Sequence, residues 1–138
     1  MIPHPPPNDP LACMADTIYY EAAGESWDGK VAVGQVILNR SNNEPSRVCA
    51  VVYARTVTAE GKKIAAFSWT LGQRWRMPGP KNWRVYAECL WIADTMLHGL
   101  LSSTEVDQSV KWYHASYVHP TWHYHLAARI GGHLFYRE

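Results

Sequence analysis

The feature that most constrains this chain is the stretch from Ile18 to Glu25, where an apolar helical pattern stops at two acidic residues and a glycine. Before this stop, apolar residues recur at the spacing of one helical face, at Leu11, Ala15, Ile18 and Ala22. A helix with such a stripe has to bury it against other elements. The chain is therefore predicted to begin with a core helix that ends at an acidic turn.

Two glutamates of this turn, Glu21 and Glu25, lie four residues apart, which would place both on one face if the helix continued. Gly24 stands where a C-terminal glycine cap would fall, and Ser26 is typical of the start of a new helix. Glu21 is thus expected in a last turn, where the helix dipole disfavours a negative charge by about 0.3–1 kcal/mol. Stability alone would not select a carboxylate there. The alternative is a solvated acid at a helix end.

Composition sets the class of protein. A chain of 138 residues, 47% of them hydrophobic, fits one compact domain with its own core. A formal net charge of +1 gives no overall field for nucleic acid or an anionic membrane. Seven Trp and eight Tyr against two Phe favour wet binding grooves, such as grooves for sugar rings. We expect a monomer that binds no nucleic acid and does not insert stably into a membrane.

Cysteines and the N-terminus indicate the compartment. Cys13, Cys49 and Cys89 are scattered in apolar runs without a C-x-x-C spacing, so buried free thiols are expected. Residues 1–8 form a proline-rich arm without the apolar segment of a signal peptide, and no run is long enough to span a bilayer. We expect synthesis in the cytoplasm.

The remaining pattern predicts a single α+β domain over residues 9–138, mainly helical, with a small late β-hairpin or sheet. A first helix is expected to be capped by Asn8 or Asp9. Segment 54–82 has no clear period and is predicted to be a functional loop. Further helices are predicted over 26–40, 45–53 and 82–98, and short strands over 110–114 and 134–136.

Two motifs at the ends of the domain are specific. Residues 15–40 read A-D-T-I-Y-Y-E-A-A-G-E-S-W-D-G-K-V-A-V-G-Q-V-I-L-N-R, and residues 129–136 read R-I-G-G-H-L-F-Y. The chain resembles the spore-cortex-lytic, SleB-type cell wall hydrolase family, which has an E-A-x-G-E turn, a G-x-x-A-V-x-x-V-x-x-N-R helix and a closing I-G-x-H-x-F motif. The resemblance extends from Leu11 to Tyr136, with Ala23 where relatives often have arginine.

The resemblance implies a lysozyme-like, lytic-transglycosylase-like domain that cuts the glycan strands of peptidoglycan without a metal or cofactor. It also implies that Glu21, which matches the first glutamate of the family's turn, is the general acid. A phage endolysin released through a holin is one expected setting, and a bacterial remodelling enzyme is another. In either case the protein is expected to act on the cell wall.

The chemistry agrees with the residues around this acid. A glycosidic oxygen leaves only when protonated, so the site needs a carboxylic acid that stays neutral near pH 7, and apolar neighbours such as Ile18 and Ala22 favour the neutral form. A lytic transglycosylase needs one such group, because the 6-hydroxyl of the sugar replaces water. A hydrolytic muramidase would need a second carboxylate about 5 Å or about 6.5–9.5 Å away. Glu25 is the near candidate, although we expect it to support the structure or bind substrate.

Hydroxyl, amide, imidazole and aromatic groups are expected to bind the sugar around this acid, although each is also explained by packing. They are Ser68, Trp69, Gln73, Tyr113, His114 and Tyr136. His133 is predicted to be a structural hydrogen-bonding residue.

The late histidines leave one alternative open. His114, His119, His123 and His125 lie within twelve residues, and three of them would suffice for the zinc site of an amidase. There is no H-E-x-x-H motif and no acid within the cluster, so groove or surface histidines are favoured. A non-catalytic glycan-binding module, supported only by the aromatic content, is the last alternative.

Overall fold

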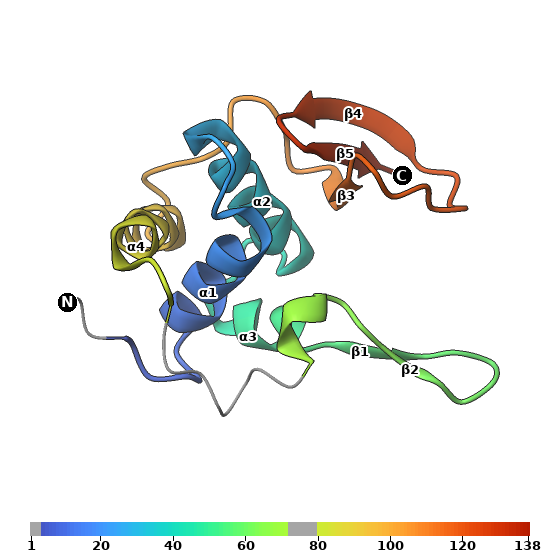
Figure 1. The fold of residues 1–138 in the computed structure, drawn as a ribbon, viewed down its shortest axis with the longest axis horizontal. Helices are drawn as coiled ribbons and strands as arrows, with labels where there is room; N and C mark the ends of the chain where they lie inside the picture. The colour runs from blue at the N-terminus through green and yellow to red at the C-terminus, as the bar shows by residue number, and fades with distance from the viewer. Residues whose placement is uncertain (1–3, 72–79) are drawn as a thin grey trace.

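A computed structural model describes residues 4–71 and 80–138 of the chain. Helices gather in one part, a three-stranded sheet lies beside them, and a two-stranded hairpin extends separately on the same side (Figure 1). Within these residues no helix combines the length and apolar character needed to cross a membrane. The elements are α1 (Pro10–Ala22), α2 (Trp27–Arg40), α3 (Val48–Val52), β1 (Arg55–Val57), β2 (Lys63–Ala65), α4 (Trp83–Leu97), β3 (Val110–Ala115), β4 (His125–Ile130) and β5 (His133–Arg137). The predicted α+β class is confirmed.

Side chains cap the helices where the sequence indicates. Asp9 accepts a hydrogen bond from the backbone N–H of Leu11 at 2.9 Å, and Pro10 is the first helical residue of α1. Ser26 caps α2 through the N–H of Gly29 at 3.2 Å, and an asparagine before Trp83 caps α4. These predicted helix starts are confirmed.

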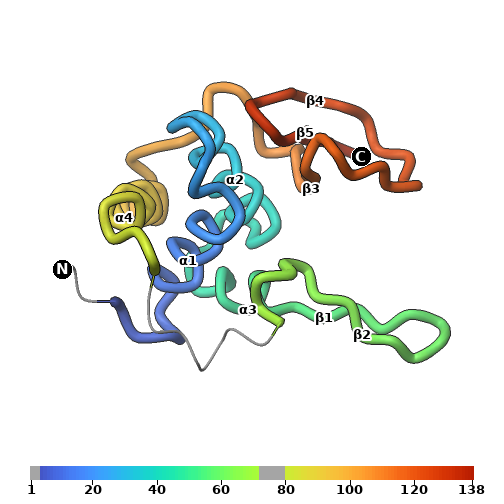
Figure 2. The backbone as a smooth tube through the Cα atoms, in the orientation of Figure 1, coloured from blue at the N-terminus to red at the C-terminus, as the bar shows by residue number. Residues whose placement is uncertain are grey.

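Helix α1 lies at the centre of the helical part, in contact with α2, α3 and α4 (Figure 2). Met14 and Ile18 of this helix are fully buried. Gly34 of α2 allows the closest approach, since a Cβ atom there would lie 2.7 Å from the sulfur of Met96 and 3.0 Å from the methyl carbon of Met14. The apolar stripe read from the sequence therefore forms the core against which the acidic turn is positioned.

The antiparallel sheet has the order β3-β5-β4 and turns one face to the helices. Phe135 and Ile130 on this inner face are buried, and Tyr113 lies opposite Phe135. His114 pairs with Leu134 in the next register position and so belongs to the outer face. Strand β4 was not predicted, because its sequence follows a polar, histidine-rich segment without alternation.

The segment 54–82 contains a hairpin that the loop prediction missed. Strands β1 and β2 pair antiparallel, with Thr56 opposite Ile64. Each strand has three residues, and all of them except Ala65 are exposed, so neither face of the hairpin is buried. A strand without a buried face shows no alternation of apolar and polar residues, so the sequence pattern could not indicate it.

One disulfide bond corrects the prediction of three free thiols. Cys13 of α1 and Cys49 of α3 are bonded, with their Cα atoms 5.3 Å apart. Cys89 is free and buried, as predicted. The two bonded residues are 36 positions apart in sequence, and only the packing of α1 against α3 brings them together.

Candidate active site

Glu21 lies in the last turn of α1, as predicted. Its side chain is half-buried, and Ile18 and Ala22 of the same helix are buried. Among the described residues, nothing donates a hydrogen bond to its carboxylate or forms an ion pair with it. Burial raises the pKa of Glu21, because the charged form loses hydration without gaining a partner. The helix end therefore holds a carboxylic acid that keeps its proton to a higher pH than an exposed glutamate does.

The helix ends by a different turn from the predicted glycine cap. Gly24 has no left-handed φ angle, and the capping residue is Ala23 in a right-handed helical conformation. The N–H of Glu25 donates to the carbonyl of Ala22 at 2.9 Å, and the Lys30 ammonium group donates to the carbonyl of Glu25 at 2.7 Å. Buried Lys30 thus fixes the backbone of the turn, so no glycine is needed for a cap.

Tyr113 of β3 is the predicted site residue whose pKa is affected by the charge of Glu21. Its hydroxyl group is buried and has no hydrogen-bond partner within the described part of the chain. Burial, followed by the negative charge of Glu21, raises the pKa of Tyr113, and Arg40 opposes this effect. An unpaired buried hydroxyl costs free energy unless something binds it. Tyr113 therefore presents an unused hydrogen-bonding group near the acid.

Arg40, at the end of α2, was not assigned to the site from the sequence. Its guanidinium carbon lies 5.7 Å from the ring centroid of Phe67, a cation–π contact. Burial lowers the pKa of Arg40, with smaller opposite effects from Tyr113 and Tyr124. The N-R ending of the first motif was the available signal, but a helix pattern does not reveal which strand the arginine meets.

Glu25 has a different environment from that of Glu21. One of its carboxylate oxygens, Oε1, accepts the backbone N–H of Gly132 at 2.8 Å and lies 3.9 Å from Nδ1 of His133. Gly131 has a φ angle of +54°, and a Cβ atom there would overlap the same oxygen. Glu25 therefore connects the turn after α1 to the turn between β4 and β5.

His133 does not make the hydrogen bond that was predicted for it. Its Nδ1 atom is buried without a hydrogen-bond partner among the residues described, since 3.9 Å to Glu25 is too long. Its ring instead contacts Tyr113 edge to face, with centroids 5.2 Å apart. Burial lowers the pKa of His133, although Glu25 opposes this. His133 therefore packs between Glu25, in the turn after α1, and Tyr113, on the inner face of the sheet.

Trp69 is part of the core rather than an open stacking surface. Its ring is buried and stacks on Tyr20 with centroids 5.1 Å apart, and its indole N–H donates to the Thr17 hydroxyl at 3.1 Å. Ser68 is exposed in the 3₁₀ turn beside it. Gln73, the remaining residue predicted in this segment, lies outside the described residues.

His114 and Tyr136 form a pair on the outer face of the sheet. The His114 Nε2 atom lies 2.8 Å from the Tyr136 hydroxyl oxygen, and the rings stack with centroids 5.1 Å apart. Tyr113, the neighbour of His114 in β3, is directed to the inner face. The structure therefore divides the predicted sugar-binding residues between the two faces.

The histidine cluster of the zinc alternative is not brought together. Within the described parts of the chain, no three His, Cys, Asp or Glu side chains are grouped so that they could hold a metal ion. His114 is instead paired with Tyr136.

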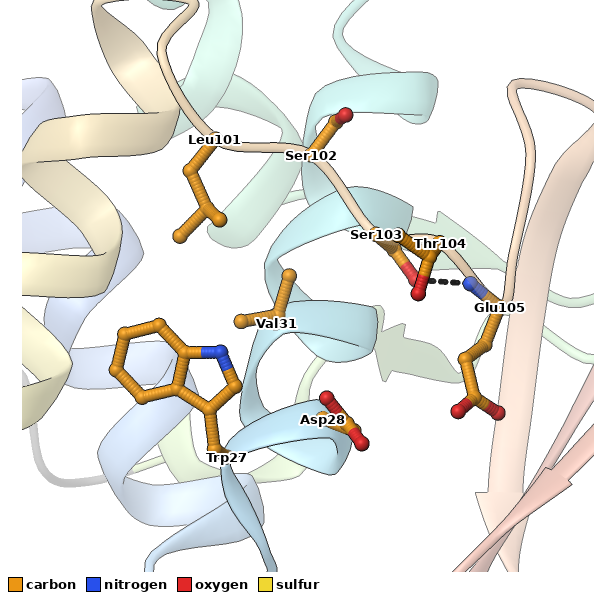
Figure 3. A pocket seen from close by; sticks show the side chains of 8 residues that line it. All are labelled: Trp27, Asp28, Val31, Leu101, Ser102, Ser103, Thr104 and Glu105. Carbon is orange, nitrogen blue, oxygen red and sulfur yellow. Dashed lines mark hydrogen bonds between the residues drawn. The ribbon is translucent and has the colours of Figure 1, made fainter.

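A small pocket at the start of α2 does not include the proposed acid. It has a volume of about 110 Å³ and lies between α2 and residues 101–105. Figure 3 shows Trp27, Val31 and Leu101 on one side of it and polar or acidic side chains on the other. Small-molecule sites usually measure roughly 300–1,000 Å³. The pocket is thus too small for a sugar unit.

The family described as Cell Wall Hydrolase matches residues 24–136. The chain therefore belongs to the cell wall hydrolase family, and the spore-cortex-lytic resemblance is confirmed. The match begins at Gly24, so it includes Glu25 but not Glu21. The endolysin setting stays a prediction.

Two curated relatives are spore cortex-lytic enzymes. That of Bacillus subtilis (strain 168) is 38% identical over 60 residues, which are 40% of this chain and 20% of that protein. That of Oceanobacillus iheyensis is 42% identical over 57 residues, 38% of this chain and 21% of that protein. The matched segments thus span about a fifth of the length of these relatives. No solved structure matches the chain.

Proposed function

We propose that the chain degrades peptidoglycan by cleaving the glycan backbone between N-acetylmuramic acid and N-acetylglucosamine, as a lytic transglycosylase with Glu21 as its acid and base. The observation that carries the proposal is the half-buried Glu21 carboxyl group, which has a raised pKa and no partner within the described residues. Family membership supports the wall as the substrate.

In the proposed reaction, protonated Glu21 gives its proton to the bridging glycosidic oxygen. The bond from this oxygen to C1 of the muramic acid unit breaks, and the N-acetylglucosamine strand leaves with a new hydroxyl group. The 6-hydroxyl of the same muramic acid then attacks C1 and loses its proton to the Glu21 carboxylate. The product is a 1,6-anhydro sugar, water is not consumed, and Glu21 is protonated again.

Tyr113 supports this proposal as a substrate-binding residue. Its buried hydroxyl is unpaired among the described residues, and the charge of Glu21 acts on it. A sugar hydroxyl or acetamido group bound beside the acid would satisfy it. Arg40 supplies a positive charge that acts on the same hydroxyl group.

The hydrolytic muramidase is less well supported, because its second carboxylate would have to be Glu25. The Oε1 atom of Glu25 already accepts the Gly132 N–H, and Gly131 leaves room for it only because it lacks a Cβ atom. The Glu25 carboxylate therefore already has a structural task, which is to hold the turn between β4 and β5. The amidase lacks a grouped set of metal ligands among the described residues.

We also propose that the protein acts outside the cytoplasm. The Cys13–Cys49 disulfide is of a kind that persists in oxidising compartments and is rare in the cytosol. Release through a holin in a phage setting, or export by a bacterial route, would bring the protein to the wall. A monomer suffices for this reaction, because the acid and Tyr113 come from one chain.

The test is digestion of purified sacculi by the wild type and by Glu21→Gln, with soluble fragments identified by mass spectrometry. We expect fragments with anhydro ends from the wild type and none from the variant. Fragments with reducing ends would show that the enzyme is a hydrolase and not a lytic transglycosylase. Undiminished release by Glu21→Gln would contradict the role of Glu21, and lysis that also stops with a chelator would indicate the amidase. Wall binding without any soluble product would favour the glycan-binding module.

A further inference from the structure

The outer face of the sheet carries an open groove of about 370 Å³ that is separate from the face directed to Glu21. It lies between the outer side of β3, β4 and β5 and the connection from β3 to β4. This connection extends to the side of the sheet away from the helices (Figure 1). The groove is thus accessible and large enough for a sugar unit.

Aromatic side chains line this outer groove in fixed positions. The partly exposed ring of Trp122 lies 5.3 Å from that of Tyr124 and 5.5 Å from that of Tyr136, between centroids. Tyr124 is in turn stacked on Trp112 at 3.8 Å, and Tyr136 is held by its hydrogen bond to His114. Rings held in this way lose little conformational entropy when a flat apolar surface, such as one face of a pyranose ring, packs on them.

The groove has a basic side chain, Arg129, among the residues that line it. Arg129 of β4 lines it, is exposed, and makes no ion pair with any described residue. His114 and His119 line it as well, and no aspartate or glutamate is among the described residues that line it. An unpaired guanidinium group beside hydroxyl and imidazole groups is complementary to a carboxylate. The groove is therefore suited to a ring that bears a negative charge.

We propose that the outer groove binds an N-acetylmuramic acid unit of a glycan strand that carries no stem peptide, so that its lactyl carboxylate is free, with its ring on Trp122 and this carboxylate on Arg129. The choice of a wall sugar rests on the proposed function, whereas a ligand combining a ring with a carboxylate follows from the groove itself. Because this groove opens on the outer face and Glu21 belongs to the inner side, it holds the strand without taking part in cleavage.

The experiment uses the full chain with Glu21→Gln, so that the ligand is not cut. Two probes are titrated: the disaccharide N-acetylglucosaminyl-N-acetylmuramic acid and chitobiose, which lacks the lactyl carboxylate. Binding is followed by the indole N–H signals in nitrogen-15 NMR spectra, with the Trp122 signal assigned from Trp122→Phe. We expect the disaccharide to shift the Trp122 signal and to bind more tightly than chitobiose.

Arg129→Gln should weaken disaccharide binding roughly tenfold, since a hydrogen bond to a charged group is lost, and should leave chitobiose unchanged. Arg129→Lys should restore part of the loss. The matched control is Arg84→Gln, which removes another exposed arginine from α4, outside the groove. The lactyl amide of the same disaccharide should bind the unaltered groove as weakly as the acid binds the Arg129→Gln variant.

The inference is overturned if the Trp122 signal does not move, or if Arg129→Gln and Arg84→Gln have equal effects. It is also overturned if the acid and its amide bind alike. These outcomes leave cleavage by Glu21 untouched, because that is measured with sacculi. Conversely, full activity of Glu21→Gln on sacculi would remove the proposed function, while the titration would still report whether the groove binds the anionic sugar.

Discussion

The two ends of the turn between α1 and α2 carry the same residue type in opposite surroundings. Glu21 is half-buried, has no hydrogen-bond or ion-pair partner among the described residues, and has a raised pKa. Glu25, four positions later, accepts the N–H of Gly132 and lies near His133. Two identical carboxyl groups are thus given different tasks by what surrounds them: burial raises the pKa of Glu21, whereas Glu25 holds a backbone N–H of the β4–β5 turn.

The difference also shows how one motif joins the two parts of the fold. Lys30 fixes the backbone of the turn and forms an ion pair with Glu88 of α4 at 2.9 Å. Glu25 then holds the β4–β5 turn, and the inner face of the same sheet carries Tyr113, whose pKa is raised in part by the charge of Glu21. Glu25 therefore positions the sheet that carries Tyr113, so it can matter for the reaction without touching a reacting atom.

The largest effect expected from this comparison is on the rate. Glu21→Gln should lower release of soluble fragments from sacculi by roughly 10²–10⁴-fold, the usual contribution of a general acid or base. Glu25→Gln should keep the rate within about tenfold of the wild type, because its amide oxygen can still accept the Gly132 N–H. The measurement is the initial rate of release by folded protein.

A matched pair of conservative substitutions makes this comparison direct, since each replaces an ionisable carboxyl group by a neutral amide of about the same size. Equal losses from Glu21→Gln and Glu25→Gln would contradict the division of roles. Loss with Glu25→Gln alone would transfer the acid role to the second position.

The helical half of the fold was predictable because its signals are local. Caps such as Ser26 and Asp9 and an apolar stripe require only neighbouring residues, and they gave the helix boundaries closely. Strands β1 and β2 have no buried face, and β4 lies in a polar aromatic region, so none showed an apolar alternation. The Cys13–Cys49 bond depends on helix packing, which cysteine spacing does not encode.

The candidate site, like the fold, was predictable only where its signals are local in the sequence. The position of Glu21 at a helix end follows from the periodic pattern before it, and its burial from the stripe. The partner of Glu25 could not be foreseen, because Gly132 is 107 positions away in sequence. The separation of Tyr113 from His114 required the register of β3 against β5, which sets the face that each side chain occupies.

A second, smaller effect concerns the stability of the Glu25 end. Gly131→Ala should destabilise the protein, because its left-handed φ of +54° costs an L-residue roughly 1–2 kcal/mol and the new Cβ atom would displace the Glu25 carboxylate. Gly99→Ala is the matched control, since its φ is +74° and its Cβ atom would meet nothing within 4 Å. Chemical denaturation should show a larger loss of unfolding free energy for Gly131→Ala.

Glu25→Ala allows the displacement to be separated from backbone strain. In that background the Cβ atom at position 131 has no carboxylate to displace, so the cost of Gly131→Ala should fall to that of Gly99→Ala. The coupling between the two sites should be about 0.5–3 kcal/mol, as for residues in contact. Additive costs would show that Glu25 does not hold the β4–β5 turn.

The smallest effect, and the one that bears most directly on Glu21, is a dependence of stability on pH. Its folded pKa is raised, so its contribution is fully present below the ordinary carboxyl pKa of about 4.3 and is lost as the pH rises through the folded value. Glu21→Gln keeps the neutral form at every pH. Its thermal midpoint should therefore exceed that of the wild type near neutral pH, and the difference should shrink toward acid pH. Buried Asp16, whose pKa burial also raises, is common to both proteins and cancels in the difference. A variant less stable than the wild type at neutral pH would mean that the Glu21 carboxylate is stabilised in the folded state, and the acid would have to be sought elsewhere.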